Sequence, residues 1–129
     1  MLSVFRGFSD NGRGEGHVAL LDSSYQVFRA IESPSTHGSL DFHEFDLLDD
    51  GQMAIVVSFQ PYQGDLSRFN VPDGLGWLLD SVFYFFNITS GEILMEWKAS
   101  EHIPLKESTV RPSIKIGAGL SYRYAFDWL

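Results

Sequence analysis

The chain alternates short apolar segments with clusters of turn-forming residues. Residues 16–21 and 25–31 flank a short Asp/Ser turn, which predicts a first hairpin. Residues 40–48 and 52–59 flank Asp49-Asp50-Gly51, which predicts a second hairpin because glycine readily adopts the positive φ of a tight turn. The apolar positions do not follow the 3.6-residue period of a helix. We therefore expect these segments to be β-strands.

The second half of the chain repeats this arrangement with bulkier side chains. Residues 60–76 form a connection that contains prolines and glycines, and residues 77–88 are the most apolar segment. Within that segment both alternations of residues 82–86 are apolar, so we expect a strand that is covered on both faces. A Thr-Ser-Gly turn at residues 89–91 leads to residues 92–98, where charged side chains share one face with a single leucine. That pattern is typical of an edge strand with one wet face.

Short strands joined by turns, one of them covered on both faces, predict an all-β fold of stacked antiparallel sheets. We interpret residues 1–129 as a single partial β-propeller domain of about one and a half blades, an incomplete propeller built as an antiparallel meander. Residues 16–31 would form the outer hairpin of one blade, and residues 40–98 a complete four-stranded blade. Residues 99–129 would hold a connector and, at residues 122–129, the start of the next blade.

Composition fits a globular domain and narrows its partners. Of 129 residues 44% are hydrophobic, and 17 Asp and Glu outnumber 9 Lys and Arg, for a net charge of −8. This charge disfavours nucleic acid and anionic lipid, because both ligands require positive side chains. Cysteine is absent, which excludes disulfides, a thiolate nucleophile and zinc–sulfur sites.

The sequence contains neither a membrane span nor an export signal. The longest apolar run, residues 82–86, is far shorter than the ~20 residues that cross a bilayer. Residues 1–16 carry Arg6 and Asp10 and lack the continuous apolar core of a signal peptide. We therefore expect no membrane insertion, and a cytoplasmic location if the sequence is complete.

His43 is the candidate catalytic residue. It begins the tripeptide His43-Glu44-Phe45 on the predicted strand 40–48, and two carboxylates, those of Asp41 and Glu44, are nearby. An imidazole beside a carboxylate can be held in one tautomer and serve as acid, base or nucleophile. The alternative is a histidine whose local hydrogen bonds serve only the fold, and for a lone histidine that is the commoner case.

The remaining candidates favour structural roles. His17 opens a strand, His37 lies in a polar loop, and His102 lies in a turn; no two histidines have the spacing of a metal site. The aspartates of residues 46–50 do not follow the calcium-loop pattern. Asn87 begins an Asn-Ile-Thr glycosylation sequon, which matters only on the secretory route. The sequence therefore predicts no metal and no cofactor.

Four stretches of the chain resemble the fungal arylsulfotransferase-like (ASST-type) proteins, which are six-bladed β-propeller sulfotransferases and their relatives. They are LLDSSYQV (20–27), LDFHEFDLLDDGQ (40–52), GWLLDSVFYFFNITSGEILMEWKASEHIPLKES (76–108) and AFDWL (125–129). The resemblance implies a truncated member of that family. It also implies sulfuryl transfer from an aryl sulfate donor to a phenolic or natural-product acceptor, in fungal secondary metabolism.

Family members of the sulfotransferase type collect several histidines and an arginine from different blades around a central channel. The resemblance carries a role over to His43 alone, which would contact the sulfuryl oxygens or assist proton transfer. Arg111, Lys115 and Arg123 match no family motif. Two non-catalytic alternatives remain, a truncated propeller fragment and a β interaction module. Because an incomplete propeller leaves apolar blade faces uncovered, we also expect self-association.

Overall fold

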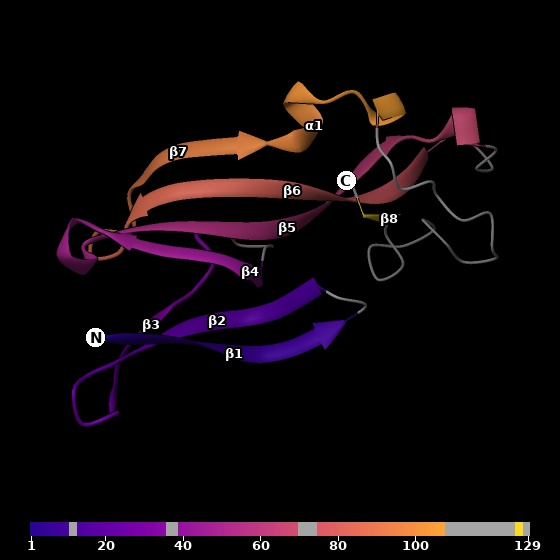
Figure 1. Cartoon of the computed structure of the whole chain (residues 1–129). Helices are drawn as coiled ribbons and strands as arrows, with labels where there is room; N and C mark the ends of the chain where they lie inside the picture. Colours follow the sequence, from indigo (N-terminus) through magenta and orange to yellow (C-terminus); the bar gives the residue numbers. More distant parts are fainter. Residues whose placement is uncertain (11–12, 36–38, 70–74, 108–125, 128–129) are drawn as a thin grey trace. The chain divides into compact units, whose positions relative to one another are not determined.

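The structure, a computed structural model, describes residues 1–10, 13–35, 39–69, 75–107 and 126–127 (Figure 1). These residues are almost entirely in strands, which confirms the all-β fold. In chain order the elements, with η for a 3-10 helix, are β1 (Leu2–Asp10), β2 (Arg13–Leu21), β3 (Val27–Ile31), β4 (Ser39–Leu48), η1 (Asp49–Gly51), β5 (Met53–Asp65), η2 (Ser67–Phe69), β6 (Leu75–Asn87), β7 (Ile93–Lys98), α1 (Ala99–His102), η3 (Leu105–Glu107) and β8 (Phe126–Asp127).

The strands pair in the order β1-β2-β4-β5-β6-β7, while β3 pairs with β2 and β8 with β6. Strands β4 to β7 are therefore neighbours in sequence order, as the predicted meander requires. This arrangement is consistent with part of a β-propeller. None of the helices among the described residues has the length and apolar character needed to cross a membrane.

The described residues form two compact units. The first contains residues Met1–Phe59 and Phe83–Trp97, and the second contains Gln60–Val82 and the described part of Lys98–Leu129. Strands β5 and β6 contribute residues to both units. The candidate histidine belongs to the first unit.

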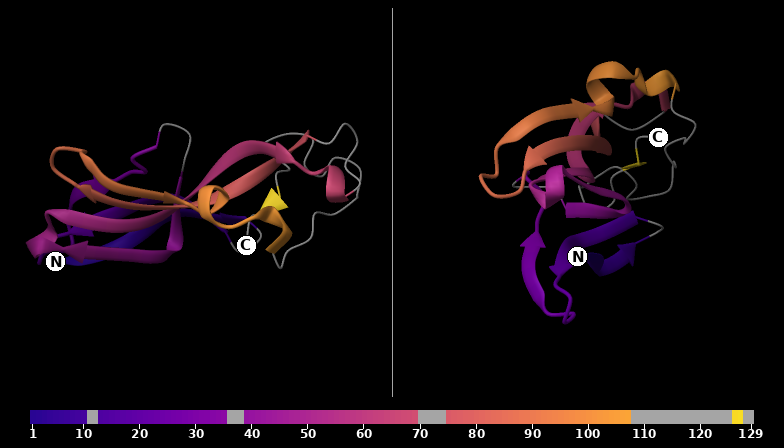
Figure 2. Two further views of the ribbon diagram at one scale, coloured as in Figure 1. Left: turned by 90° about the horizontal axis from the view of Figure 1, so that it is seen from above. Right: turned by 60° about the vertical axis from the view of Figure 1, so that its left-hand side comes forward.

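Strand β1 is a part of the first unit that the sequence analysis did not predict. It pairs antiparallel with β2 along its whole length, from Leu2 opposite Leu21 to Asp10 opposite Arg13. Figure 2 shows these strands from two further directions. The segment has no regular alternation of apolar and polar residues, so its conformation depends on pairing with β2 rather than on a local signal.

The first predicted hairpin is confirmed as β2 and β3, which pair antiparallel. Its second strand starts at Val27, two residues later than predicted, because the turn is longer. Asp22 Oδ1 accepts hydrogen bonds from the backbone N–H groups of Ser24 (2.8 Å) and Gln26 (3.0 Å), and Tyr25 has a φ of 60°. Such aspartate side chains commonly stabilise turns.

The turn between β4 and β5 is also confirmed, with more strain than the sequence suggests. Asp49, Asp50 and Gly51 all have positive φ, at 52°, 50° and 86°. Only the glycine adopts this region without steric cost, although aspartate tolerates it better than most residues. A side chain at position 51 would therefore destabilise the hairpin.

The apolar segment becomes β6, which is covered more completely on one face than on the other. Val82, Tyr84 and Phe86 are buried, whereas Phe83 and Phe85 are partly buried. The prediction that both faces of this strand are buried is therefore correct for one face, while the other face is only partly buried.

Strand β7 lies at the end of the strand order, as expected for an edge strand. Its apolar side chains are more exposed than the alternation suggested. Ile93, Met95 and Trp97 are 42%, 46% and 37% exposed, and Leu94 on the other face is 50% exposed. Both faces of β7 are thus accessible in the described structure.

The second unit has a small core of its own, in which Leu66, Leu78 and Ala99 are buried together. Strand β8 pairs parallel with β6 at Leu78 and Leu79. This strand falls within the predicted segment 122–129, whose other residues lie outside the described residues.

Candidate functional site

The candidate histidine lies on a bulge of β4. Leu40 pairs with Ser58 and Phe45 pairs with Val56, so four residues of β4 stand opposite one residue of β5. Residues 41–44 therefore leave the ladder between the two strands. Bulges of this kind redirect side chains and often occur beside functional sites.

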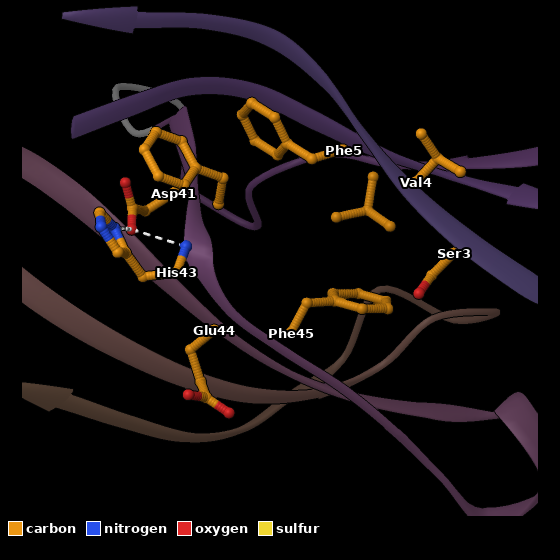
Figure 3. A pocket seen from close by; sticks show the side chains of 9 residues that line it. Ser3, Val4, Phe5, Asp41, His43, Glu44 and Phe45 are labelled. Atoms are coloured by element: carbon orange, nitrogen blue, oxygen red, sulfur yellow. Dashed lines mark hydrogen bonds and ion pairs between the residues drawn. The ribbon is translucent and has the colours of Figure 1, made fainter. Parts of the chain in front are cut away.

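A buried carboxylate organises the bulge. Asp41 is only 2% exposed, and its Oδ1 accepts a hydrogen bond from the backbone N–H of Gly14 on β2 at 2.5 Å. Its Oδ2 accepts one from the backbone N–H of His43 at 3.0 Å and a second from the His43 ring at Nδ1 (Figure 3). A buried carboxylate without partners would be costly, and here three donors satisfy it.

The His43 ring is held on one edge and one face, and the rest of it is accessible. Its side chain is 62% exposed. The ring stacks on Phe42 with centroids 4.3 Å apart and planes at 29°, and Phe42 in turn meets Phe5 of β1 edge-on at 5.7 Å. No described residue forms a hydrogen bond with Nε2. The imidazole is thus oriented by its neighbours and presents one nitrogen outward.

A pocket of about 290 Å³ lies beside the ring. Strands β1, β2 and β4 supply its described lining, which is Ser3, Val4, Phe5, Val18, Asp41, Phe42, His43, Glu44 and Phe45. Five of the nine lining residues are apolar, although polar atoms form most of the exposed lining, and the Glu44 carboxylate is directed away from Asp41 (Figure 3). No lysine or arginine occurs among these lining residues.

This arrangement suits proton transfer better than anion binding. An exposed imidazole with a fixed orientation can accept or donate a proton at a bound hydroxyl. Holding a sulfuryl group requires several donors or cations around its oxygens, and the described lining offers two carboxylates instead. The chemistry that the described lining supports best is therefore that of one acid–base group, His43.

The other two histidines among the described residues, His17 and His102, do not line this pocket. The Nδ1 atom of His17 lies 3.8 Å from Oε1 of Glu32. His102 is exposed at the end of α1. His37, together with Arg111, Lys115 and Arg123, lies outside the described residues. Among the residues that the structure places, no three His, Asp or Glu side chains are grouped to hold a metal ion.

Sequence reasoning missed the part of the site that comes from β1 and β2. Gly14 binds Asp41, and Phe5 supports Phe42, yet neither lies near His43 in the sequence. The glycines between residues 12 and 16 were the available signal, since close backbone approach is one reason for glycine in a strand.

The Asn87 sequon lies in the turn after β6, where Asn87 Oδ1 accepts hydrogen bonds from the backbone N–H groups of Thr89 and Ser90.

A second buried carboxylate lies in the second unit and has a structural role. Asp80 is 3% exposed and accepts hydrogen bonds from the backbone N–H of Ser100 at 2.9 Å and from the Ser100 hydroxyl. It thereby fixes the start of α1. Burial raises the pKa of the Tyr62 hydroxyl well above its ordinary value, and the negative charge of Asp80 adds to this shift.

Fold and site together define an antiparallel all-β protein in which a buried aspartate orients an exposed histidine beside a pocket. Residues 1–126 match the family model described as Arylsulfotransferase (ASST). The chain therefore belongs to this family, and its function is arylsulfotransferase-like at the family level. No curated protein and no solved structure matches the chain.

Proposed function

We propose that this protein takes part in sulfuryl transfer from an aryl sulfate to a phenolic or natural-product acceptor, in fungal secondary metabolism. The observation that carries the proposal is the exposed, oriented imidazole of His43 beside a pocket, in a chain that belongs to the arylsulfotransferase family. The lining includes the aromatic side chains of Phe5, Phe42 and Phe45, which can pack against an aromatic ring and so support a phenolic acceptor.

In the proposed step, the imidazole of His43 accepts the proton of the acceptor hydroxyl while the hydroxyl oxygen attacks the donor sulfur. A sulfur–oxygen bond to the acceptor forms as the sulfur–oxygen bond to the donor ring breaks. The donor leaves as a phenolate with the bonding electrons. The proton then passes from His43 to that phenolate, which restores the neutral imidazole.

The sulfuryl oxygens would be bound by groups other than those described around His43. Because the described pocket lining has carboxylates and no lysine or arginine, it would repel an anionic donor on its own. The positive groups would come from residues outside this described lining, either in this chain or in further copies of it that complete the propeller.

The test is turnover of para-nitrophenyl sulfate with a phenol as acceptor, measured for the wild type, His43→Ala and His102→Ala. Loss of a general base typically costs 10²- to 10⁴-fold, so His43→Ala should lower the rate by roughly 100-fold or more. His102→Ala removes an exposed histidine outside the pocket lining and should retain wild-type turnover. Equal background rates in wild type and His43→Ala would refute the enzymatic proposal.

A non-catalytic interaction module is the second candidate. The observations that favour it are the absence of a positive side chain from the described pocket lining and the exposed apolar residues of β7. On this alternative, wild-type turnover equals that of buffer at every protein concentration. The assay above therefore separates the two candidates.

A further inference from the structure

The geometry points to Asp41 as a positioning residue that keeps neutral His43 in the tautomer with hydrogen on Nδ1. This leaves Nε2 as the nitrogen that accepts the substrate proton, a role that rests on the function proposed above. The tautomer itself is a property of the chain without substrate.

The hydrogen-bonding capacity of the two groups determines which atom carries the hydrogen. The Nδ1 atom of His43 is hydrogen-bonded to Oδ2 of Asp41. An ionised carboxylate can only accept hydrogen bonds, so Nδ1 must be the donor. A neutral imidazole has one N–H, and its other nitrogen then carries the lone pair.

Asp41 is held in place and cannot turn away from the ring. The side chain is 1% exposed, and the backbone N–H groups of Gly14 and His43 fix one oxygen each. Rotation would break both bonds and leave a buried charge without donors, which costs several times the net value of a normal hydrogen bond. The carboxylate is therefore fixed by the fold before any substrate binds.

The orientation of the imidazole ring is restrained as well. Stacking on Phe42 covers one face of the imidazole, and the edge-on contact with Phe5 restrains Phe42. A ring flip would replace the Nδ1 donor at Asp41 with a carbon atom. Since the side chain is 62% exposed, the free nitrogen remains accessible from solvent.

Glu44 provides a matched control, because it is the other carboxylate of the same bulge. It is exposed, and its side chain is directed away from Asp41 (Figure 3). Asp41→Asn and Glu44→Gln each remove one negative charge next to His43. Only Asp41→Asn removes the acceptor at Nδ1, because an asparagine that still accepts from Gly14 must turn its NH₂ group toward the ring.

The experiment is long-range ¹H–¹⁵N correlation NMR of the histidine rings in ¹⁵N-labelled protein, at a pH where His43 is neutral. We expect the Nδ1–H tautomer in wild type and in Glu44→Gln, and a predominant Nε2–H tautomer in Asp41→Asn. A wild-type His43 with hydrogen on Nε2 overturns the inference, even if Asp41→Asn fails to fold. An unchanged Nδ1–H tautomer in folded Asp41→Asn overturns it too.

Turnover adds a second readout that a purely structural role would not move. With His43 as base, Asp41→Asn should lower kcat by roughly 100-fold with little change in KM. Glu92→Gln, which changes an exposed carboxylate outside the pocket lining, should retain kcat. If His43→Ala leaves turnover unchanged, the proposed function fails. The NMR measurement still tests the assignment of the Nδ1–H tautomer independently.

Discussion

At the scale of single residues, the site depends on a glycine that lies far from His43 in the sequence. A Cβ at Gly14 would lie 2.4 Å from a ring carbon of Phe42 and 2.7 Å from the Phe42 backbone nitrogen. Atoms in proteins do not approach this closely, and a backbone atom cannot move aside as a flexible side chain can. The bulge of β4 and the strand β2 therefore fit together only with glycine at this position.

We expect Gly14→Ala to lower the free energy of unfolding by about 1–3 kcal/mol, the usual cost of an overpacked site. The same change should displace Asp41 and mix the tautomers of His43. Urea denaturation gives the first quantity and ring NMR the second. Glu15→Ala, at the next position, should stay within about 0.5 kcal/mol of wild type. A Gly14→Ala variant as stable as Glu15→Ala would contradict this account.

At the scale of elements, turns were predictable because their signals are local. The aspartate and glycine of residues 49–51 and the Asp/Ser turn at residues 22–24 identified two hairpins correctly. Strand β1 and the bulge of β4 were not predictable, since both depend on pairing between distant segments. Both Asp41 and Glu44 were evident from the sequence as carboxylates near His43, but neither the choice of Asp41 nor the contribution of Gly14 was predictable.

The start of α1 gives a prediction at the element scale. Asp80 accepts both the backbone N–H and the hydroxyl of Ser100, so Asp80→Ala should leave a backbone donor and the hydroxyl without their partner. We expect a loss of about 1–3 kcal/mol in the free energy of unfolding. Ser100→Ala removes only the hydroxyl bond and should cost less. Thermal or urea unfolding would contradict this ranking if Ser100→Ala were the more damaging change.

At the scale of the whole molecule, the exposed apolar residues of β7 bear on assembly. Four of its six residues are large apolar side chains with exposures of 37% to 50%, and β7 ends the strand order. An accessible strand with apolar side chains favours pairing with another chain. Self-association through this strand remains a prediction.

We expect sedimentation velocity to show oligomers whose population rises with protein concentration. Leu94→Lys places a charge on the edge strand and should shift the distribution toward monomer. Phe28→Lys removes an equally exposed apolar residue from β3 and serves as the control. A wild-type protein that remains monomeric at all concentrations would rule out this assembly.

The two edges of β2 have a consequence for local opening of the structure. This strand pairs with β1 on one edge, while β3 and β4 share the other. Amides in strands bonded on both sides exchange with deuterium mainly through larger unfolding events. The Gly14 amide donates its hydrogen bond to the buried carboxylate of Asp41. Its deuterium uptake would then show, without any substrate present, whether the contact that holds Asp41 beside His43 is intact.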